Sequence, residues 1–154
     1  MTRLIEGAME GAGLHIGVVV ANWNRSVTDR LLDGALQALD RMSVNDVTVL
    51  RVPGALEIPV GARKLIEAGC DAVVAIGTVV RGETDHYEIV VRESTTGVAR
   101  LSLETGVPVT NSILAVTEYS QALERASEGP SNKGYEAAEA AVSTAVALGR
   151  VVQS

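Results

Sequence analysis

The sequence predicts an α/β fold in which a parallel sheet is covered by helices on both faces. Strand-like and helix-like segments alternate four times along the 154 residues, which is the pattern of successive strand–helix units. The runs at 15–21 and 72–80 are unbroken stretches of small and β-branched residues, as expected for strands that are buried on both faces. An apolar content of 47% agrees with one well-packed domain.

Each element is predicted from apolar spacing and from the residues that end it. Residues 1–13 contain three glycines and no clear period, so they are interpreted as an N-terminal arm that could add a strand to a neighbouring subunit. Residues 14–154 are expected to form a single α/β domain. The predicted strands are 15–21, 46–52, 71–80 and 108–114, and the predicted helices are 28–42, 55–68, 84–105, 118–126 and 134–152.

Composition excludes several classes of function. A net charge of −6, with no Phe and one Trp, argues against nucleic acid as a partner. No apolar run approaches the length of a membrane span, and the N-terminus lacks a signal-peptide pattern, so a cytoplasmic location is expected. The single cysteine, Cys70, excludes an internal disulfide framework and is expected to be a structural thiol.

The turn after the third predicted strand is the strongest candidate site. It lies at the carboxyl end of a strand, where ligands bind in open α/β sheets. The free backbone N–H groups of residues 82–85 and the dipole of the next helix would together attract an anion. His86 falls in the first turn of that helix, where the dipole opposes a cation, so the ring is expected to stay neutral and act as a base. The alternative is an ordinary exposed histidine.

Three further positions carry a functional and an ordinary reading. Trp23 lies in the loop after the first strand, where it could contact a ligand or fill the core. Glu57 lies near a helix start, where it could bind a ligand or only balance the dipole. Asn132 is a good N-cap, but Lys133 and Gly134 both disfavour a helix start. This conflict suggests a binding role for Lys133, and the alternative is a solvated lysine at a frayed end.

Several familiar catalytic motifs are absent from the sequence. It has no GxxxxGK[ST] loop, no GxGxxG after the first strand and no GxSxG elbow. The two histidines are far apart and no metal-ligand spacing is present, so a metal site is not expected.

Five segments, taken together, resemble the lumazine synthase family. They are WNRSVT (23–28), VPGALEIP (52–59), GTVVRGETDHY (77–87), LETGVPV (103–109) and NKGYEAA (132–138). The similarity runs in order from about residue 16 to residue 147. Any one segment would be a weak signal, but five in register are highly specific.

The resemblance implies a flavodoxin-like three-layer α/β/α sandwich with a four-stranded parallel sheet, assembled into pentamers. It implies the synthesis of 6,7-dimethyl-8-ribityllumazine from 5-amino-6-(ribitylamino)pyrimidine-2,4-dione and 3,4-dihydroxy-2-butanone 4-phosphate, the penultimate step of riboflavin biosynthesis. No cofactor or metal would be required. The pentamer could close further into an icosahedral 60-mer, and riboflavin synthase is a candidate partner.

The resemblance also implies a role for each matching residue. His86 matches the family's proton-transfer histidine. The residues that match the pyrimidine and ribityl site are Trp23, Ala55, Leu56, Glu57, Thr78, Val79 and Val80, with Asn111 and Lys133 from the facing subunit. The residues that match the phosphate site are Gly82, Glu83 and Thr84, with Arg125 across the interface.

Two acidic residues depart from the family pattern. Glu83 stands where family members usually have a neutral residue, and Asp85 where Pro or Thr is common. Two carboxylates beside a phosphate dianion would repel it, so the departures bear on the affinity for the butanone phosphate. A non-catalytic flavin-binding or shell-forming protein on the same fold is the alternative, and an unrelated flavodoxin-like binding module is a more distant one.

Overall fold

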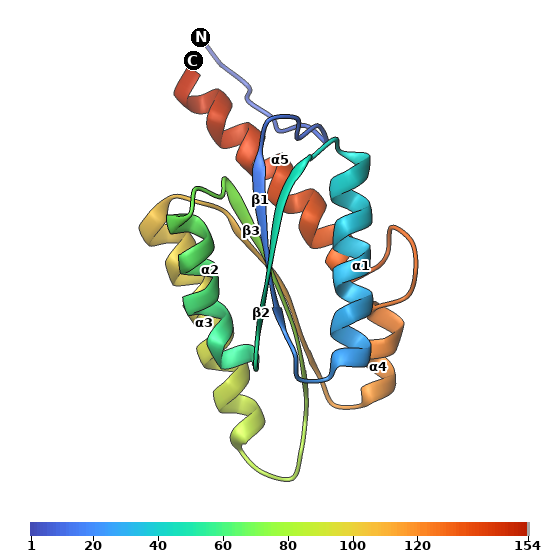
Figure 1. Cartoon of the computed structure of the whole chain (residues 1–154). Coiled ribbons are helices and arrows are strands. Elements are labelled where there is room, and N and C mark those ends of the chain that lie inside the picture. Colours follow the sequence, from blue (N-terminus) through green and yellow to red (C-terminus); the bar gives the residue numbers. More distant parts are fainter. Residues whose placement is uncertain (154) are drawn as a thin grey trace.

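A computed structural model describes residues 1–153 and confirms the parallel α/β sheet. Four parallel strands lie in the order β2-β1-β3-β4 (Figure 1). Their bounds are His15–Ala21 for β1, Asp46–Val52 for β2, Ala72–Val80 for β3 and Val109–Val116 for β4. Because β2 and β3 lie on opposite sides of β1, the strand order reverses at β1.

Helices cover both faces of the sheet and make the fold three layers thick (Figure 1). One buried cluster joins β1 and β3 to α1 (Arg25–Arg41), α4 (Tyr119–Arg125) and α5 (Lys133–Gln153). The other joins the opposite face to α2 (Ile58–Glu67) and α3 (His86–Thr105). The two central strands are almost wholly buried, whereas β2 is an edge strand with exposed positions. No helix in residues 1–153 is long and apolar enough to cross a membrane.

The predicted helix starts differ from the observed ones for local reasons. Helix α1 begins at Arg25, three residues earlier than predicted, because Asn24 turns the chain directly into the helix. Residues Ala55–Glu57 form a separate 3-10 helix, η1, rather than the start of α2. Helix α3 begins at His86 and not near Thr84, so the turn before it is longer and exposed. Strand β4 continues two residues beyond its predicted end, to Val116, which pairs with Val80.

The N-terminal arm runs beside α5 of its own chain (Figure 1). Residues 1–13 contain no helix or strand. Gly7 lies directly against Ser143, and Arg150 Nη1 donates a hydrogen bond of 2.8 Å to the carbonyl of Glu6. Pairing of the arm with a neighbouring subunit stays a prediction, as does the domain boundary at residue 14. Residue 154, the end of the predicted domain, lies outside the described residues.

Candidate active site

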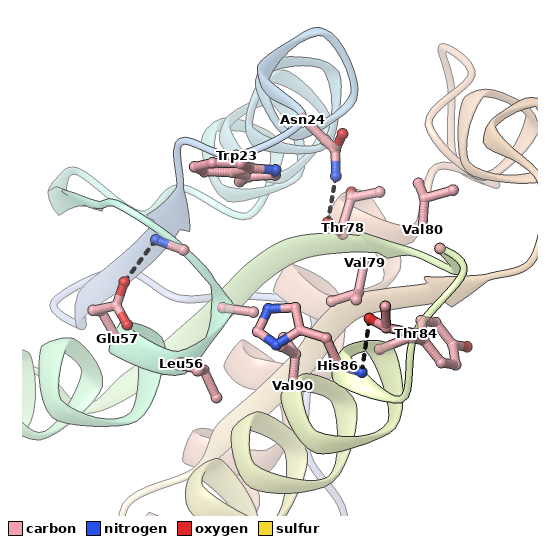
Figure 2. Close-up of a pocket in the computed structure, with 14 residues that line it drawn as sticks. Trp23, Asn24, Leu56, Glu57, Thr78, Val79, Val80, Thr84, His86 and Val90 are labelled. Carbon is pink, nitrogen blue, oxygen red and sulfur yellow. Dashed lines mark hydrogen bonds between the residues drawn. The ribbon is translucent and has the colours of Figure 1, made fainter.

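A cavity of about 390 Å³ opens at the carboxyl ends of β1 and β3, beside the point where the strand order reverses. Ligands bind at this position in open α/β sheets, and the volume is in the range of small-molecule sites. Its walls come from three stretches of the chain, 23–24, 54–57 and 78–90, and Figure 2 shows how their side chains border the cavity. The lining residues are Trp23, Asn24, Gly54, Ala55, Leu56, Glu57, Thr78, Val79, Val80, Gly82, Thr84, His86, Tyr87 and Val90.

This pocket brings together most of the residues that the sequence singled out. Those that line it are Trp23, Ala55, Leu56, Glu57, Thr78, Val79, Val80, Gly82, Thr84 and His86. Glu83 belongs to the same turn but is exposed and does not line the cavity. The predicted turn, loop and strand end therefore form one site, although they lie far apart in the sequence.

Two large apolar residues of the pocket wall are exposed to solvent. Trp23 is 74% exposed and Leu56 is 43% exposed, so neither residue fills the core of this chain. An exposed indole beside aliphatic groups suits a planar ring, which can stack on the indole face. Of the two readings of Trp23, the core reading is therefore wrong.

The carboxylate of Glu57 is fixed in place and still has free acceptor capacity. The backbone N–H of Gly54 donates to Glu57 Oε1 over 3.1 Å, which closes the short turn of η1. This is the one hydrogen bond that the carboxylate makes within residues 1–153. A carboxylate accepts about four hydrogen bonds in all, so Glu57 can accept several from hydroxyl groups of a ligand.

His86 is the first residue of α3 and is exposed. Its backbone N–H donates to Thr84 Oγ1 over 3.4 Å, while the ring makes no hydrogen bond within the described chain. Figure 2 shows the imidazole projecting from the helix start into the space that Trp23 and Leu56 also border. Both ring nitrogens are therefore available to a bound molecule.

The turn before α3 is held at its edges and open in its middle. The backbone N–H of Arg81 donates to the Val116 carbonyl over 2.9 Å, and its guanidinium pairs with Glu88 at 3.0 Å. Gly82 and Glu83 make no hydrogen bond within residues 1–153. Their N–H groups lie close to the start of a helix, where an anion is favoured.

A second cleft, of about 430 Å³, lies along the edge strand β4. Its lining residues are Thr110, Asn111, Ser112, Ile113, Leu114, Arg125, Lys133, Glu136, Ala137 and Ala140. The three remaining predicted residues, Asn111, Lys133 and Arg125, thus lie together. They do not line the pocket that contains His86, so the predicted residues are divided between two separate clefts of the described chain.

The two cationic side chains of this second cleft use only some of their hydrogen-bond donors within the described chain. Lys133 Nζ pairs with Glu136 at 2.9 Å, and the two side chains are 44% and 46% exposed. Arg125 Nη1 donates to the Gln121 carbonyl over 3.0 Å, which leaves most of the guanidinium donors free. Both side chains can therefore turn toward an incoming anion or polar ring.

The structure explains the conflicting signals at the start of α5. Asn132 is buried, and its Oδ1 accepts from the N–H groups of Gly134 at 2.8 Å and Tyr135 at 3.1 Å. A Cβ on Gly134 would come within 1.9 Å of the Leu31 carbonyl oxygen, so glycine is required where α5 meets α1. The helix start is capped and not frayed, and it holds the exposed lysine in a fixed place.

Sequence reasoning missed several lining residues, among them Asn24, Tyr87, Val90, Ser112 and Glu136. Val90 lies one turn after His86 on the small and apolar face of α3, so its position was recoverable. Thr78 Oγ1 and Ser112 Oγ are buried without a hydrogen-bond partner in the described chain. Buried polar atoms are rarely left unpaired; the two residues line different clefts, but their hydroxyl oxygens are buried beneath the cleft surfaces.

Two comparisons with known proteins gave matches. A family model described as 6,7-dimethyl-8-ribityllumazine synthase matches residues 13–149. A curated protein of Thermococcus kodakarensis (strain ATCC BAA-918 / JCM 12380 / KOD1), named 6,7-dimethyl-8-ribityllumazine synthase, is 49% identical over 144 residues. That alignment covers 93% of this chain and 92% of the relative.

Proposed function

The chain belongs to the 6,7-dimethyl-8-ribityllumazine synthase family, and from this premise we propose that its two clefts are halves of one active site shared between subunits. The reaction condenses 5-amino-6-(ribitylamino)pyrimidine-2,4-dione with 3,4-dihydroxy-2-butanone 4-phosphate and releases phosphate and water. The enzyme is a transferase of riboflavin biosynthesis. Nothing in the comparisons favours a non-catalytic protein on the same fold.

The distribution of charge carries this proposal. The pocket that contains His86 has no Lys or Arg among its lining residues, and Glu57 is part of its wall. Arg125 and Lys133 line the other cleft. A substrate with a phosphate dianion needs cationic donors, and guanidinium groups bind phosphate bidentately. Because one chain separates the base from the cations, a second copy is the simplest source of the missing half.

The contact that joins the halves would be heterologous, because one cleft of a subunit meets the other cleft of its neighbour. Such contacts produce closed rings when the rotation between subunits closes. The cleft at β4 lies on an open edge of the sheet, where a neighbour can reach it. A ring of five, as the family resemblance implies, is the smallest assembly that we propose.

The pyrimidine would lie between Trp23 and the carboxyl end of β3. The indole face offers stacking, and Thr78, Val79 and Val80 border the heterocycle. Glu57 would accept hydrogen bonds from the ribityl hydroxyls beside Ala55 and Leu56. Asn111 and Lys133 of the facing subunit would contact the polar edge of the ring.

The phosphate would lie against the turn before α3. The N–H groups of Gly82 and Glu83, the hydroxyl of Thr84 and the facing Arg125 supply its donors. The substrate amine attacks the ketone, and loss of water gives an imine. Phosphate then leaves with its bonding electrons, and closure of the second ring expels another water. His86 lies where it can take up and return the protons of these steps.

An intersubunit complementation experiment tests the shared site. His86→Ala and Lys133→Ala subunits would be co-expressed with different tags, and mixed rings isolated through both. If assembly is random, a site has both intact halves with a probability of about one in four, so about a quarter of wild-type lumazine formation should return. Mixed rings that are no more active than the separate variants would exclude a site built from these two clefts.

For the finer assembly, the proposal is supported by the short connection between α4 and α5. Only residues 126–132 join the two helices, and family members with a short connection here close into an icosahedral shell. We therefore propose the 60-mer over the free pentamer. Light scattering would distinguish roughly 80 kDa from 1 MDa for five or sixty copies of a 16.1 kDa chain. A clean pentamer peak would contradict the argument from length.

Two features of the cellular setting belong to the same proposal. A cytoplasmic location suits a substrate whose phosphate charge prevents unaided passage through a membrane. Riboflavin synthase is a candidate partner because it would consume the lumazine product. Co-purification of the two enzymes from one extract would test the partnership.

A further inference from the structure

Asn24 has a backbone conformation that its helix does not require. It is the N-cap of α1, with φ at 60° and ψ at 48°. Among the non-glycine residues that the structure describes, only Ser43 also has a positive φ. N-cap side chains usually accept a hydrogen bond from the first turn of the helix. Asn24 makes no such cap bond, so helix capping does not account for this side chain.

Its amide instead bonds to the strand that forms the floor of the pocket. Asn24 Nδ2 donates to the carbonyl of Thr78 over 2.8 Å (Figure 2). The pairing between β1 and β3 ends at Val20 and Ile76, and Thr78 lies two residues further along β3. The side chain of Asn24 therefore satisfies a carbonyl that β1 no longer reaches.

This bond closes a three-point attachment of the loop that carries Trp23. The backbone N–H groups of Asn22 and Trp23 donate to the carbonyls of Val52 at 2.7 Å and Pro53 at 3.0 Å. These two bonds tie one side of the loop to the end of β2, and Asn24 ties its other side to β3. Trp23 is 74% exposed, so core packing does not fix its position.

We propose that Asn24 is a positioning residue that holds the Trp23 ring at the height and tilt needed to stack on the pyrimidine substrate. The inference rests on the proposed function, since it takes the pocket beside Trp23 as the pyrimidine site. The left-handed backbone aims the amide at β3, and Asn tolerates that conformation better than most residues. Without the tether, the ring loses its fixed relation to Thr78 and its neighbours.

Two substitutions separate the side chain from the backbone. Asn24→Gly keeps the left-handed conformation without strain and removes the amide. Asn24→Asp keeps the shape but removes the N–H donor. Loss of one neutral hydrogen bond predicts a rise of about 5-fold in the KM for the pyrimidine, with kcat and the KM for the butanone phosphate nearly unchanged. Since Trp23 is the one tryptophan, its fluorescence anisotropy without ligand should also fall.

Ser43→Gly is the matched control, because it relieves the other positive φ, 62°, at a position outside both clefts. It should keep wild-type KM values and anisotropy. Wild-type anisotropy and pyrimidine KM in Asn24→Gly would overturn the inference, and so would equal losses for both substrates. If the wild-type enzyme formed no lumazine, the proposed function would fail, while the ligand-free anisotropy would still test the tether.

Discussion

One of the two histidines of the chain lies at each end of the sheet. The two imidazole rings differ in their exposure and in their hydrogen bonds. At the amino end, the His15 side chain is 22% exposed. Its Nε2 bonds to Thr48 Oγ1 at 2.8 Å and lies 3.7 Å from Asp46. At the carboxyl end, the ring of His86 is exposed and has no hydrogen-bond partner in the described chain.

Other polar groups follow the same division. The N–H of His15 donates to Asp71 at 2.8 Å, and Cys70 Sγ lies 3.6 Å from the His15 ring. At the carboxyl end, a buried threonine hydroxyl and the N–H groups of the turn before α3 are left unpaired. Groups that satisfy each other stabilise the fold, whereas the exposed N–H groups of the turn are solvated and stay available to a ligand. The division therefore separates the end of the sheet whose polar groups are paired from the end where we propose that substrates bind.

The largest effect is expected from His86→Ala. Proton transfer by a positioned side chain is typically worth 10²–10⁴-fold in rate, and we expect a loss of about 10²-fold, because imine chemistry also proceeds slowly unaided. The variant should still assemble, because His86 is exposed and belongs to neither buried cluster. Steady-state lumazine formation, measured with light scattering on the same sample, gives both quantities.

His15→Ala is the matched control at the other end of the sheet. It removes the bond to Thr48 and should leave turnover unchanged, because that end contains no part of either cleft. Wild-type turnover in an assembled His86→Ala protein would remove His86 from the mechanism. A comparable loss in His15→Ala would show that the two ends are not functionally separate.

Arg125→Ala should have the next largest effect, on substrate affinity. A hydrogen bond to a charged group is worth about 1.5–3 kcal/mol, which predicts a rise of roughly 20-fold in the KM for the butanone phosphate. The KM for the pyrimidine should change little. Arg100→Ala removes an equal charge from an exposed position on α3 and serves as the control. An unchanged phosphate KM in Arg125→Ala would contradict its assignment.

The burial of the amino end of the sheet can be tested through the pKa of Cys70. Burial, reinforced by the charges of Asp46 and Asp71, raises the pKa of Cys70 from 9.0 to about 11. Since the folded state keeps the proton that the unfolded chain loses above pH 9, the stability due to Cys70 falls as the pH rises from 9 to 11. At pH 10 the loss should be about 1.4 kcal/mol.

Urea unfolding of wild type and Cys70→Ala at pH 7 and pH 10 isolates this contribution. The difference in unfolding free energy between the two proteins should narrow by the predicted amount, whereas other titrating groups affect both equally. A difference that stays constant between the two pH values would mean that the thiol is not shielded in the folded state.

The fold could be predicted from sequence because its signals are local. Unbroken apolar runs mark β1 and β3, and apolar spacing marks the helices. The predicted helix starts were less accurate, because α1 begins after Asn24 and η1 begins after Gly54 through backbone conformations that the composition does not reveal. Gly134 illustrates the same limit: its local cost was visible, but its cause is the Leu31 carbonyl in another helix.

The site residues were predicted one by one from the family resemblance. Local sequence signals alone did not predict that these residues would be divided between two clefts of one chain. The resemblance assigned Asn111 and Lys133 to the facing subunit, and the folded chain places the two residues together in the cleft along β4. Asn24 was seen within a motif, yet its bond to Thr78 depends on where β1 stops pairing. Contacts between elements, and between subunits, are what sequence spacing leaves open.

The smallest expected effect is the gain from Glu83→Ala, which tests how open the carboxyl end is to anions. Glu83 is exposed, beside the proposed phosphate donors and without a partner in the described chain. Its charge should repel the phosphate dianion, but water and salt screen exposed charges. We therefore expect the KM for the butanone phosphate to fall only about 3-fold at low ionic strength, and less at high salt. Glu104→Ala, at the exposed far end of α3, should leave this KM unchanged. Competition by inorganic phosphate against both variants supplies the measurement. An unchanged or weaker phosphate affinity in Glu83→Ala would mean that the carboxylate points to solvent and does not oppose the substrate.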